Sequence, residues 1–264
     1  MSRAESIDII KGSDEIMIIW NHKKDEDIDM LGIIGAMAVE VEQLKQDMEN
    51  PEVITIAGME FFKGTILGKE TVVVRSGVGK VNAGICVQIL VDRFGVTGIV
   101  NTGIAGSLRA EINIGDMVLC TDAVQHDMEA VAFGYQPGQI PQMDVFSFEA
   151  DEKLRNLAKE CCERVNPEIS VHVGRVLTGD QFISSKEKKN WLTETFGGCC
   201  CEMEGAAIAQ AAYLNHVPFL IVRAISDKAD DSASMDYPEF ERLAVIHSTN
   251  LTRALIAAYE SSTS

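Results

Sequence analysis

The sequence is poor in basic residues. Its 264 residues include 23 Lys and Arg against 40 Asp and Glu, which gives a formal net charge of −17. Nucleic acids and anionic membranes are bound through clustered positive charge, so we expect neither as a partner. The chain also lacks an apolar run of about 20 residues, the length of a membrane-spanning helix. It does not open with a basic segment and an apolar core, so we expect no secretion signal and a cytoplasmic protein.

The motifs of several well-known chemistries are absent. The sequence contains no CxxC pair and no HExxH, which are usual spacings of zinc ligands. No GxGxxG follows the first predicted strand, and no GxxxxGK[ST] loop for nucleotide phosphates occurs. A GxSxG elbow, which would indicate serine acyl chemistry, is missing as well. We therefore expect neither a metal nor a cofactor.

Three consecutive cysteines, Cys199 to Cys201, stand directly before Glu202 and Glu204. Such a cluster could hold a metal, but consecutive residues of a strand point to alternate faces and cannot all reach one ion. We interpret them as small apolar residues that enter a buried strand. The odd total of seven cysteines is typical of reduced thiols rather than of a disulfide framework.

The chain changes character at Met30. Residues 1–30 are rich in charge and show little periodicity, whereas Met30 begins the apolar run MLGIIGAM. An apolar run followed by glycine is typical of the first strand of an α/β domain. We therefore expect residues 1–30 to be a poorly ordered N-terminal extension or an over-long gene start, and residues 31–264 to form one domain. A regulatory arm is the competing interpretation, and no motif supports it.

After Met30, apolar runs of strand length alternate with amphipathic segments of helical length. Strands are predicted at 31–37, 52–58, 59–67, 70–77, 98–103, 116–125, 172–180, 198–204 and 217–227, and helices at 39–48, 80–94, 149–165, 205–216 and 237–260. This alternation indicates the α/β class. We predict a single three-layer domain whose mixed, mostly parallel central sheet is flanked by helices.

Carboxylates recur where these predicted strands end. Glu40 follows the first strand, and Glu202 and Glu204 follow the cysteines. Asp227 ends the strand VPFLIVRAISD, which also carries Arg223. Ligands of such sheets bind beyond the carboxyl ends of strands, and carboxylates beside an arginine suggest acid–base chemistry on a polyhydroxylated substrate. Singly, each residue has a structural explanation: Asp227 as a helix N-cap, Glu40 on a solvated helix face, and Arg223 in an ion pair.

Eight short motifs follow one another between about residues 31 and 260. They are GIIGAM with a later Glu, SGVGKVNAG, NTGIAGSL, INIGD, AFGYQPGQIP, GDQF, EMEGAAIA and VRAISDKAD. In this order they resemble the nucleoside phosphorylase/hydrolase superfamily and, within it, the 5′-methylthioadenosine/S-adenosylhomocysteine nucleosidase family. The resemblance implies a nucleoside phosphorylase-like fold, no cofactor, a homodimer, and hydrolysis of the N-glycosidic bond of adenine thioribosides.

The resemblance also implies an acid and a base. Cleavage passes through an oxocarbenium-like transition state, and adenine leaves once its N7 is protonated. The family's acid matches Asp227, whose carboxyl must have a raised pKa to stay protonated, with Ser226 beside it as an orienting group. The family's attacking water is held by residues that match Glu40 and Arg223. A phosphorylase would need positive charge there, and GAMAVEVE contains no base, so hydrolysis is the favoured reaction.

Further matches concern the ribose and the base. Met203 and Glu204 match the family's ribose-binding pair, in which the carboxylate accepts hydrogen bonds from the sugar hydroxyls. Phe182 matches the ring that stacks on adenine, and backbone groups at Ile183 match those that read its Watson–Crick edge. Glu202 either supports this site or is a structural carboxylate.

The wall around the sugar and its 5′-thio group matches Met37, Val78 and Tyr237. The family's partner subunit closes this pocket with residues that match Phe133 and Pro141. Tyr237 stands where Phe is commoner in the family, which adds a hydroxyl near the 5′-substituent.

Ile104 departs from the family motif, which usually has a Ser near the attacking water. One hydrogen bond to the water would therefore be lost.

Three functions stay open. The first is a hydrolase of methylthioadenosine and adenosylhomocysteine. The second is another enzyme of the superfamily, either a phosphorylase or a nucleosidase for a different adenine riboside of the aminodeoxyfutalosine type, and the third is a non-catalytic nucleoside sensor. Because both an acid and a base are present, an enzyme is favoured over a sensor. His126 could be a ligand, although a core histidine is the simpler interpretation.

Overall fold

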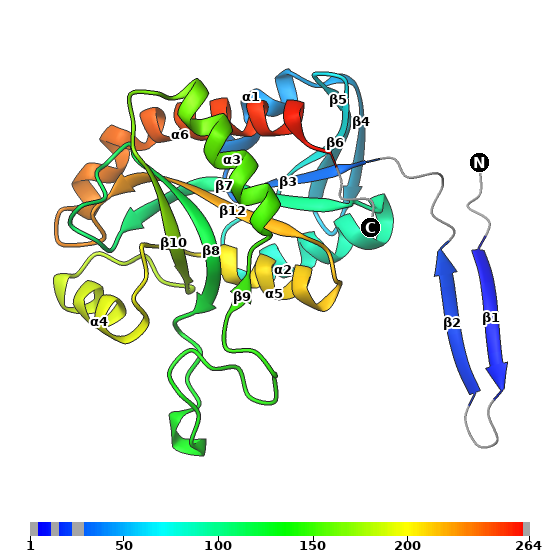
Figure 1. The fold of residues 1–264 in the computed structure, drawn as a ribbon, viewed down its shortest axis with the longest axis horizontal. Coiled ribbons are helices and arrows are strands. Elements are labelled where there is room, and N and C mark those ends of the chain that lie inside the picture. The colour runs from blue at the N-terminus through cyan, green and yellow to red at the C-terminus, as the bar shows by residue number, and fades with distance from the viewer. Residues whose placement is uncertain (1–4, 12–15, 23–28, 261–264) are drawn as a thin grey trace.

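A mixed β-sheet forms the centre of the molecule (Figure 1). The structure is a computed structural model that describes residues 5–11, 16–22 and 29–260, with side chains at 29–233 and 240–260. In the described part of the chain the sheet has ten strands in the order β11, β10, β8, β12, β7, β3, β6, β5 and β4, with β9 paired to β8. Their bounds are β3 Leu31–Gly35, β4 Glu49–Ile56, β5 Met59–Ile66, β6 Lys69–Arg75, β7 Gly98–Ser107, β8 Met117–Gln125, β9 Phe148–Glu149, β10 Val171–Thr178, β11 Cys200–Glu202 and β12 Phe219–Asp227.

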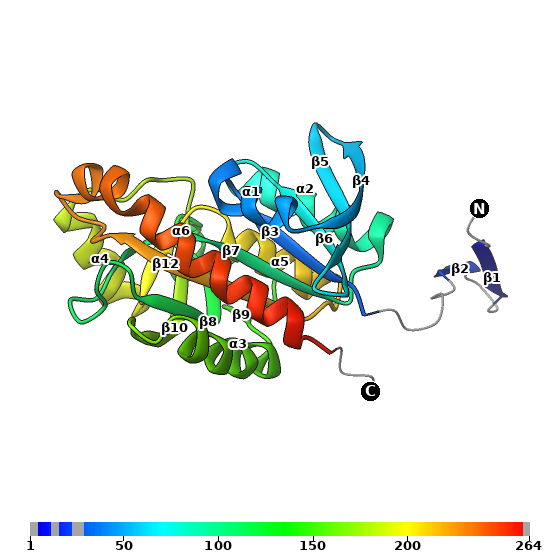
Figure 2. The ribbon, with the colours of Figure 1, turned by 90° about the horizontal axis from the view of Figure 1, so that it is seen from above.

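Helices cover both faces of this sheet (Figures 1 and 2). Their bounds are α1 Ala38–Gln46, α2 Lys80–Ile89, α3 Glu152–Val165, α4 Lys186–Phe196, α5 Gly205–Leu214 and α6 Ala233–Ala258. Helix α6 packs on β7 and β12 with α1 and α3 against it, and α2 and α5 pack together on the opposite face. Helix α2 continues into a π-helical turn at Leu90–Phe94. Among the described helices, none is both long and apolar enough to cross a membrane.

Strands of both directions meet where the predicted site residues lie. Strands β3, β6, β7 and β12 run parallel to one another, whereas β8 pairs antiparallel with β12 and β11 pairs antiparallel with β7. Because β11 also pairs with β10, and β10 with β8, these strands close into a ring with β7 and β12. The register sets Cys201 opposite Gly106 and Arg223 opposite Gly103. The chain direction of β11 therefore carries its next residue, Glu202, toward Arg223.

The predicted fold class, a three-layer α/β domain with a mixed sheet, is confirmed. The apolar run FLIVRAI of β12 is buried throughout, as expected for a strand that is covered on both sides. The prediction missed α4, because the segment KEKKNWLTETF is polar over most of its surface and buries only Leu192 and Phe196. It also ended the strand at 98–103 too early, since β7 continues to Ser107, and it began the last helix at 237 instead of Ala233.

Residues 1–30 contain two strands that the sequence did not predict. Strands β1 (Glu5–Lys11) and β2 (Ile16–His22) pair antiparallel and form a two-stranded sheet of their own (Figure 1). Residues 1–4, 12–15 and 23–28 lie outside the described residues, so the poor order of the extension stays a prediction. The main sheet begins next to Met30, whose N–H donates to Thr97 Oγ1 (3.1 Å) and whose carbonyl accepts from the Thr97 N–H (2.8 Å).

Candidate active site

A hollow of about 440 Å³ opens beside the ends of β3, β11 and β12 and the glycine-rich part of β7. This volume lies in the range of small-molecule sites. The sequence-predicted residues that line it are Met37, Glu40, Val78, Ile104, Phe182, Met203, Glu204, Ser226 and Asp227. The lining also includes residues to which the sequence assigned no contact with a ligand: Ala36, Ala105, Gly106, Cys201 and Glu202.

Glu40 is the third residue of α1 and is buried. Its Oε2 accepts hydrogen bonds from the backbone N–H groups of Ala36 (2.7 Å) and Met37 (2.9 Å), and its Oε1 accepts from that of Ile104 (3.2 Å). Burial raises the pKa of this carboxyl, while the three N–H groups and the charge of Arg223 act in the opposite direction. The three N–H groups hold the carboxylate in one orientation. Its raised pKa makes it a stronger base than the carboxylate of an exposed Glu.

Arg223 lies within β12, buried behind the hollow rather than on its wall. Its Nη2 donates to Glu202 Oε2 at 2.5 Å and to Asn101 Oδ1, and its Nη1 donates to the Asn101 carbonyl at 3.1 Å. A Cβ atom on Gly103 would lie 2.7 Å from Glu40 Oε1 and 3.5 Å from Arg223 Nη1. The guanidinium therefore stands close to Glu40 but forms its ion pair with Glu202. Its predicted contact with the attacking water stays a prediction.

Glu202 accepts hydrogen bonds at both carboxylate oxygens. Its Oε1 accepts from Thr178 Oγ1, and its Oε2 accepts from the N–H groups of Glu204 (3.1 Å) and Gly205 (2.7 Å) as well as from Arg223. These bonds tie β11 to the start of α5 and to β12. Of the two interpretations that the sequence left open, a carboxylate that supports the site from within the protein therefore fits this geometry.

Glu204 stands at the N-terminus of α5 and faces the hollow. Its Oε1 accepts a hydrogen bond from the backbone N–H of Gly79 (2.8 Å). Burial and the negative charge of Glu202 raise the pKa of this carboxyl to about 7, although the Gly79 N–H and Arg223 lower it. The ionisation of Glu204 therefore depends on its few donors, and the Gly79 N–H both orients and stabilises the carboxylate.

A bulge at the end of β12 sets the direction of Asp227. The register of β12 against β7 shifts at Ser226, which leaves Asp227 opposite Gly106. The hydroxyl of Ser226 donates to Asp227 Oδ2 (2.9 Å), and Asp227 Oδ1 accepts from the Ala229 N–H (2.8 Å). Asp227 is not the N-cap of α6, which begins six residues later at Ala233. Only a glycine fits at 106, because a Cβ there would lie 2.7 Å from Asp227 Oδ1.

The remaining wall is apolar and open on one side. Val78 and Phe182 are 49 % and 52 % exposed, whereas Ile104 is buried and Met37 is half-buried. An apolar ring that is half exposed at the rim can pack against a flat base without closing the entrance. Ile104 lines the hollow near Glu40, and the loss of one hydrogen bond to the attacking water stays a prediction.

Besides Arg223, three predicted residues do not line the hollow in the described part of the chain. The Ile183 side chain packs in a small apolar cluster behind it, so that only its backbone remains for recognition. Phe133 is 84 % exposed in the turn Val131–Phe133, and Pro141 is half-buried in the same long connection. Tyr237 belongs to α6, but its side chain lies outside the described residues.

The chain is similar to proteins of one family over most of its length. A family model described as "Phosphorylase superfamily" matches residues 30–257. A 5′-methylthioadenosine/S-adenosylhomocysteine nucleosidase of Halalkalibacterium halodurans is 42 % identical over 227 residues, which cover 86 % of this chain and 97 % of the relative. The chain belongs to this nucleosidase family. The predicted resemblance is confirmed.

Solved structures of the family extend the similarity to three dimensions. The Neisseria meningitidis nucleosidase in complex with methylthio-immucillin-A has a TM-score of 0.84 and 34 % identity, covering 88 % of this chain and all of the other. A futalosine hydrolase of Helicobacter pylori has a TM-score of 0.83 and 33 % identity, covering 88 % and 99 %. Fold similarity alone therefore does not distinguish between these two kinds of nucleosidase.

The cysteines of this nucleosidase-family chain are buried, as the sequence predicted. Cys200 and Cys201 form the start of β11, and Cys201 reaches the wall of the hollow. Burial raises the pKa of both thiols well above the ordinary value, so both stay protonated. The thiolate is the form that binds metals, and the described residues contain no group of three or more His, Cys, Asp or Glu suited to a metal ion.

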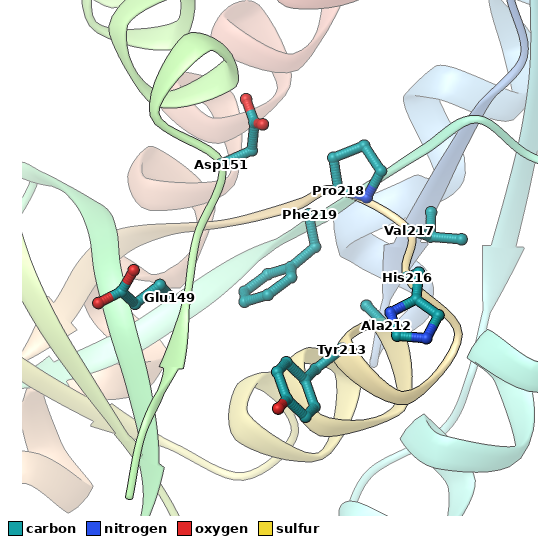
Figure 3. Close-up of a pocket in the computed structure, with 8 residues that line it drawn as sticks. All are labelled: Glu149, Asp151, Ala212, Tyr213, His216, Val217, Pro218 and Phe219. Atoms are coloured by element: carbon teal, nitrogen blue, oxygen red, sulfur yellow. The ribbon is translucent and has the colours of Figure 1, made fainter. Parts of the chain in front are cut away.

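A second hollow, of about 320 Å³, lies at the opposite end of β12 around Phe219 (Figure 3). Tyr213 of α5 lines one side, and Glu149 and Asp151 line the other. Glu149 is exposed, and Asp151 Oδ1 already accepts the Leu154 N–H (2.8 Å) as the N-cap of α3. Neither carboxyl is thus a buried acid, so the nucleosidase chemistry fits the first hollow and not the second.

Proposed function

We propose that this chain hydrolyses the N-glycosidic bond of 5′-methylthioadenosine and S-adenosylhomocysteine, which releases adenine and the thioribose. One observation carries the proposal: two buried carboxyl groups, Asp227 and Glu40, reach the same hollow from different strand ends. An acid on one side of a glycosidic bond and a base on the other are what hydrolysis of that bond requires. Membership of the nucleosidase family supports the same substrates.

The residues of the hollow divide the reaction among them. Asp227 gives its proton to N7 of adenine as the glycosidic bond breaks, and the Ser226 hydroxyl keeps the carboxyl oriented. Glu40 accepts a proton from the water that attacks the anomeric carbon. Glu204 accepts hydrogen bonds from the ribose hydroxyls, which strengthen as positive charge develops on the sugar. Phe182 packs against the base.

The charges around the hollow favour water over phosphate as the nucleophile. A phosphorylase needs positive charge free to bind a dianion. Arg223, the arginine that the structure describes behind the hollow, is paired with Glu202, and the ionised form of Glu40 would repel phosphate. The side chain of Ile104, next to Glu40, adds an apolar surface that offers no hydrogen bond to phosphate. This arrangement supports hydrolysis.

Chromatography of the products tests the proposed function. The protein is incubated with 5′-methylthioadenosine, with S-adenosylhomocysteine and with futalosine, each with and without phosphate. Free adenine and thioribose from the first two substrates, independent of phosphate, are expected. Methylthioribose 1-phosphate that forms only with phosphate would instead make the protein a phosphorylase. Turnover of futalosine alone would place it with the Helicobacter pylori hydrolase, and the absence of product from every substrate would indicate a sensor.

Replacement of Glu40 by Gln should lower kcat by roughly two to four orders of magnitude, the usual contribution of a general base. The amide also places a donor against one of three backbone N–H groups, so the free energy of unfolding should fall by about 1–3 kcal/mol. Steady-state kinetics and denaturant unfolding measure both effects. Glu42→Gln, at an exposed position of the same helix, is the matched control and should leave both unchanged. Normal turnover by Glu40→Gln would refute its role as the base.

We also propose that the protein is a cytoplasmic homodimer in which the partner closes the hollow. The exposed Phe133 and Val131 support this arrangement, because large apolar side chains at such exposure are typical of surfaces that bind another chain. The exposed rim of the hollow at Val78 and Phe182 is the kind of surface such a partner would cover. Sedimentation velocity at micromolar concentration tests this, and a monomer with full activity would contradict it.

Residues 31–264 form the catalytic domain in this proposal, and the extension is dispensable. Removal of residues 1–29 retains Met30 and its two hydrogen bonds to Thr97. We expect the shortened chain to keep kcat, KM and the melting temperature of the full chain. Kinetics and calorimetry of both forms measure this. A loss of activity would instead support the interpretation of the extension as a regulatory arm.

A further inference from the structure

Asp127 joins two loops that border the hollow. It lies two residues beyond the end of β8, and its side chain is 15 % exposed. Its Oδ1 accepts a charge-assisted hydrogen bond from Lys80 Nζ (2.6 Å), and its Oδ2 accepts from the backbone N–H of Asp180 (3.0 Å). Lys80 is the first residue of α2, and Asp180 lies in the loop that follows β10. One carboxylate therefore fixes the distance between the first residue of α2 and the loop that follows β10.

Asp180 completes the connection. Its Oδ1 accepts the backbone N–H of Lys80 (2.9 Å), and the α-carbon of Gly79 is so close that a Cβ would lie 3.1 Å from this oxygen. Gly79 has φ +100°, which favours glycine, and its N–H is the donor to Glu204 Oε1. We call the three residues Lys80, Asp127 and Asp180 the clasp. The clasp holds the donor that orients the ribose carboxylate.

The other side of the clasp leads to the adenine wall. Phe182 lies two residues after Asp180, in the same loop. The ring of His126 supports this loop from below, since a Cβ on Gly179 would lie 2.4 Å from His126 Cε1. Neither ring nitrogen of His126 has a hydrogen-bond partner among the described residues, so the ring supports the loop through van der Waals contact with Gly179. The loop is held by polar contacts on two sides: the Gly179 N–H donates to the Glu202 carbonyl (3.1 Å), and the Asp180 N–H donates to Asp127. The second contact is the one that ties the loop to the segment after β8.

We infer that Asp127 is a positioning residue that couples the ribose carboxylate Glu204 to the adenine wall at Phe182 through the clasp. Asp127 is not among the described residues that line the hollow, so it acts on the substrate through Lys80 and Asp180. The inference deepens the proposed function and rests on it. The hydrogen bonds of the clasp reach the substrate side through one neighbouring residue, Gly79, on the Glu204 side and through the two residues that follow Asp180 on the Phe182 side.

The variant Asp127→Asn breaks the clasp with little change of volume. Two donors, the Lys80 ammonium and the Asp180 N–H, need two acceptor oxygens, and an amide offers one oxygen and a competing N–H₂ group. Loss of a hydrogen bond to a charged group should raise KM for 5′-methylthioadenosine roughly tenfold or more, with a smaller fall in kcat. Isothermal calorimetry should show a matching loss of affinity for adenine alone, because Phe182 is displaced as well.

Asp122→Asn is the matched control. Asp122 of β8 pairs with Arg175 of β10 at 2.6 Å and is 14 % exposed, so the same chemical change affects a comparably buried ion pair that does not line the hollow. A merely structural role for Asp127 would lower stability and the active fraction in both variants without a change in KM. We expect the KM change in Asp127→Asn and not in Asp122→Asn.

A second variant, Lys80→Met, keeps the Asp127 oxygen for Asp180 and removes the other half of the clasp. Lys80→Met should also raise KM, as Asp127→Asn does. It serves as the test if Asp127→Asn does not fold. Unchanged KM and adenine affinity in the folded clasp variants, or an equal change in Asp122→Asn, would overturn the inference. A wild-type protein that releases no adenine would overturn the proposed function instead, and adenine affinity would still test the clasp.

Discussion

Asp227→Asn should reduce adenine release by at least about a thousandfold, within the range that a positioned general acid contributes. An amide cannot give up a proton to adenine N7, whereas it keeps the size of the carboxyl. Its oxygen can still accept the Ala229 N–H that Asp227 Oδ1 accepts, so the bulge of β12 should persist. Single-turnover kinetics would measure the loss, and calorimetry with 5′-methylthioadenosine should show that binding changes by less than about tenfold.

The exposed Asp231, four residues further along the chain, provides the control, since Asp231→Asn makes the same replacement outside the hollow. It should turn over at the wild-type rate. Two results would contradict the assignment of Asp227 as the general acid. One is substantial turnover by Asp227→Asn, and the other is a loss of substrate binding that parallels the loss of rate.

Glu202→Gln should have the largest effect on stability. The change leaves the buried charge of Arg223 without its ion-pair partner and turns one acceptor into a donor that faces other donors. Breaking a buried ion pair on one side costs about 3–5 kcal/mol. In a chain of this size we expect the melting temperature to fall by roughly 10 °C. Activity per folded molecule should fall too, because Arg223 would then act more strongly on Glu40 and lower its basicity.

Calorimetric unfolding and kcat of the folded fraction measure the two effects. Asp47→Asn breaks the pair between Asp47 and Arg253, which is also 2.5 Å long but is partly exposed, unlike the buried Glu202 pair. Surface pairs contribute at most about 1 kcal/mol, so this control should melt close to the wild type. Equal melting temperatures for the Glu202 and Asp47 variants would show that the buried Glu202–Arg223 pair contributes no more to stability than the more exposed Asp47–Arg253 pair.

The sequence predicted the location of the carboxylates because their positions follow from strand ends. Glu40 and Asp227 lie at or near the ends of the apolar strands β3 and β12, and parallel strands present such ends on one side of a sheet. No motif predicted that β11 runs antiparallel to β7, because a strand of three residues with cysteines on both faces has no periodicity to read. The ion pair of Glu202 depends on that reversal.

Other details were missed for local reasons. The strand at 98–103 was ended at a glycine, although in β7 the glycines at 103 and 106 make room for the carboxyls of Glu40 and Asp227. Helix α4 was missed because polar side chains cover most of its surface and only Leu192 and Phe196 are buried. The links among Lys80, Asp127 and Asp180 join residues that lie 47 to 100 positions apart, and local patterns carry no information about contacts of that kind.

Glu40 has two tasks, and their combination limits how this protein can evolve. The oxygens that activate the water in the proposed mechanism also accept the N–H groups of Ala36 and Met37, just before α1, and one N–H of β7. A descendant that gave up turnover and kept only nucleoside capture would still need an acceptor at this position, or the start of the helix would fray. Retention of Glu40 in a relative is therefore weak proof of turnover, whereas its loss, together with a new helix cap, would mark a lineage that has abandoned the reaction.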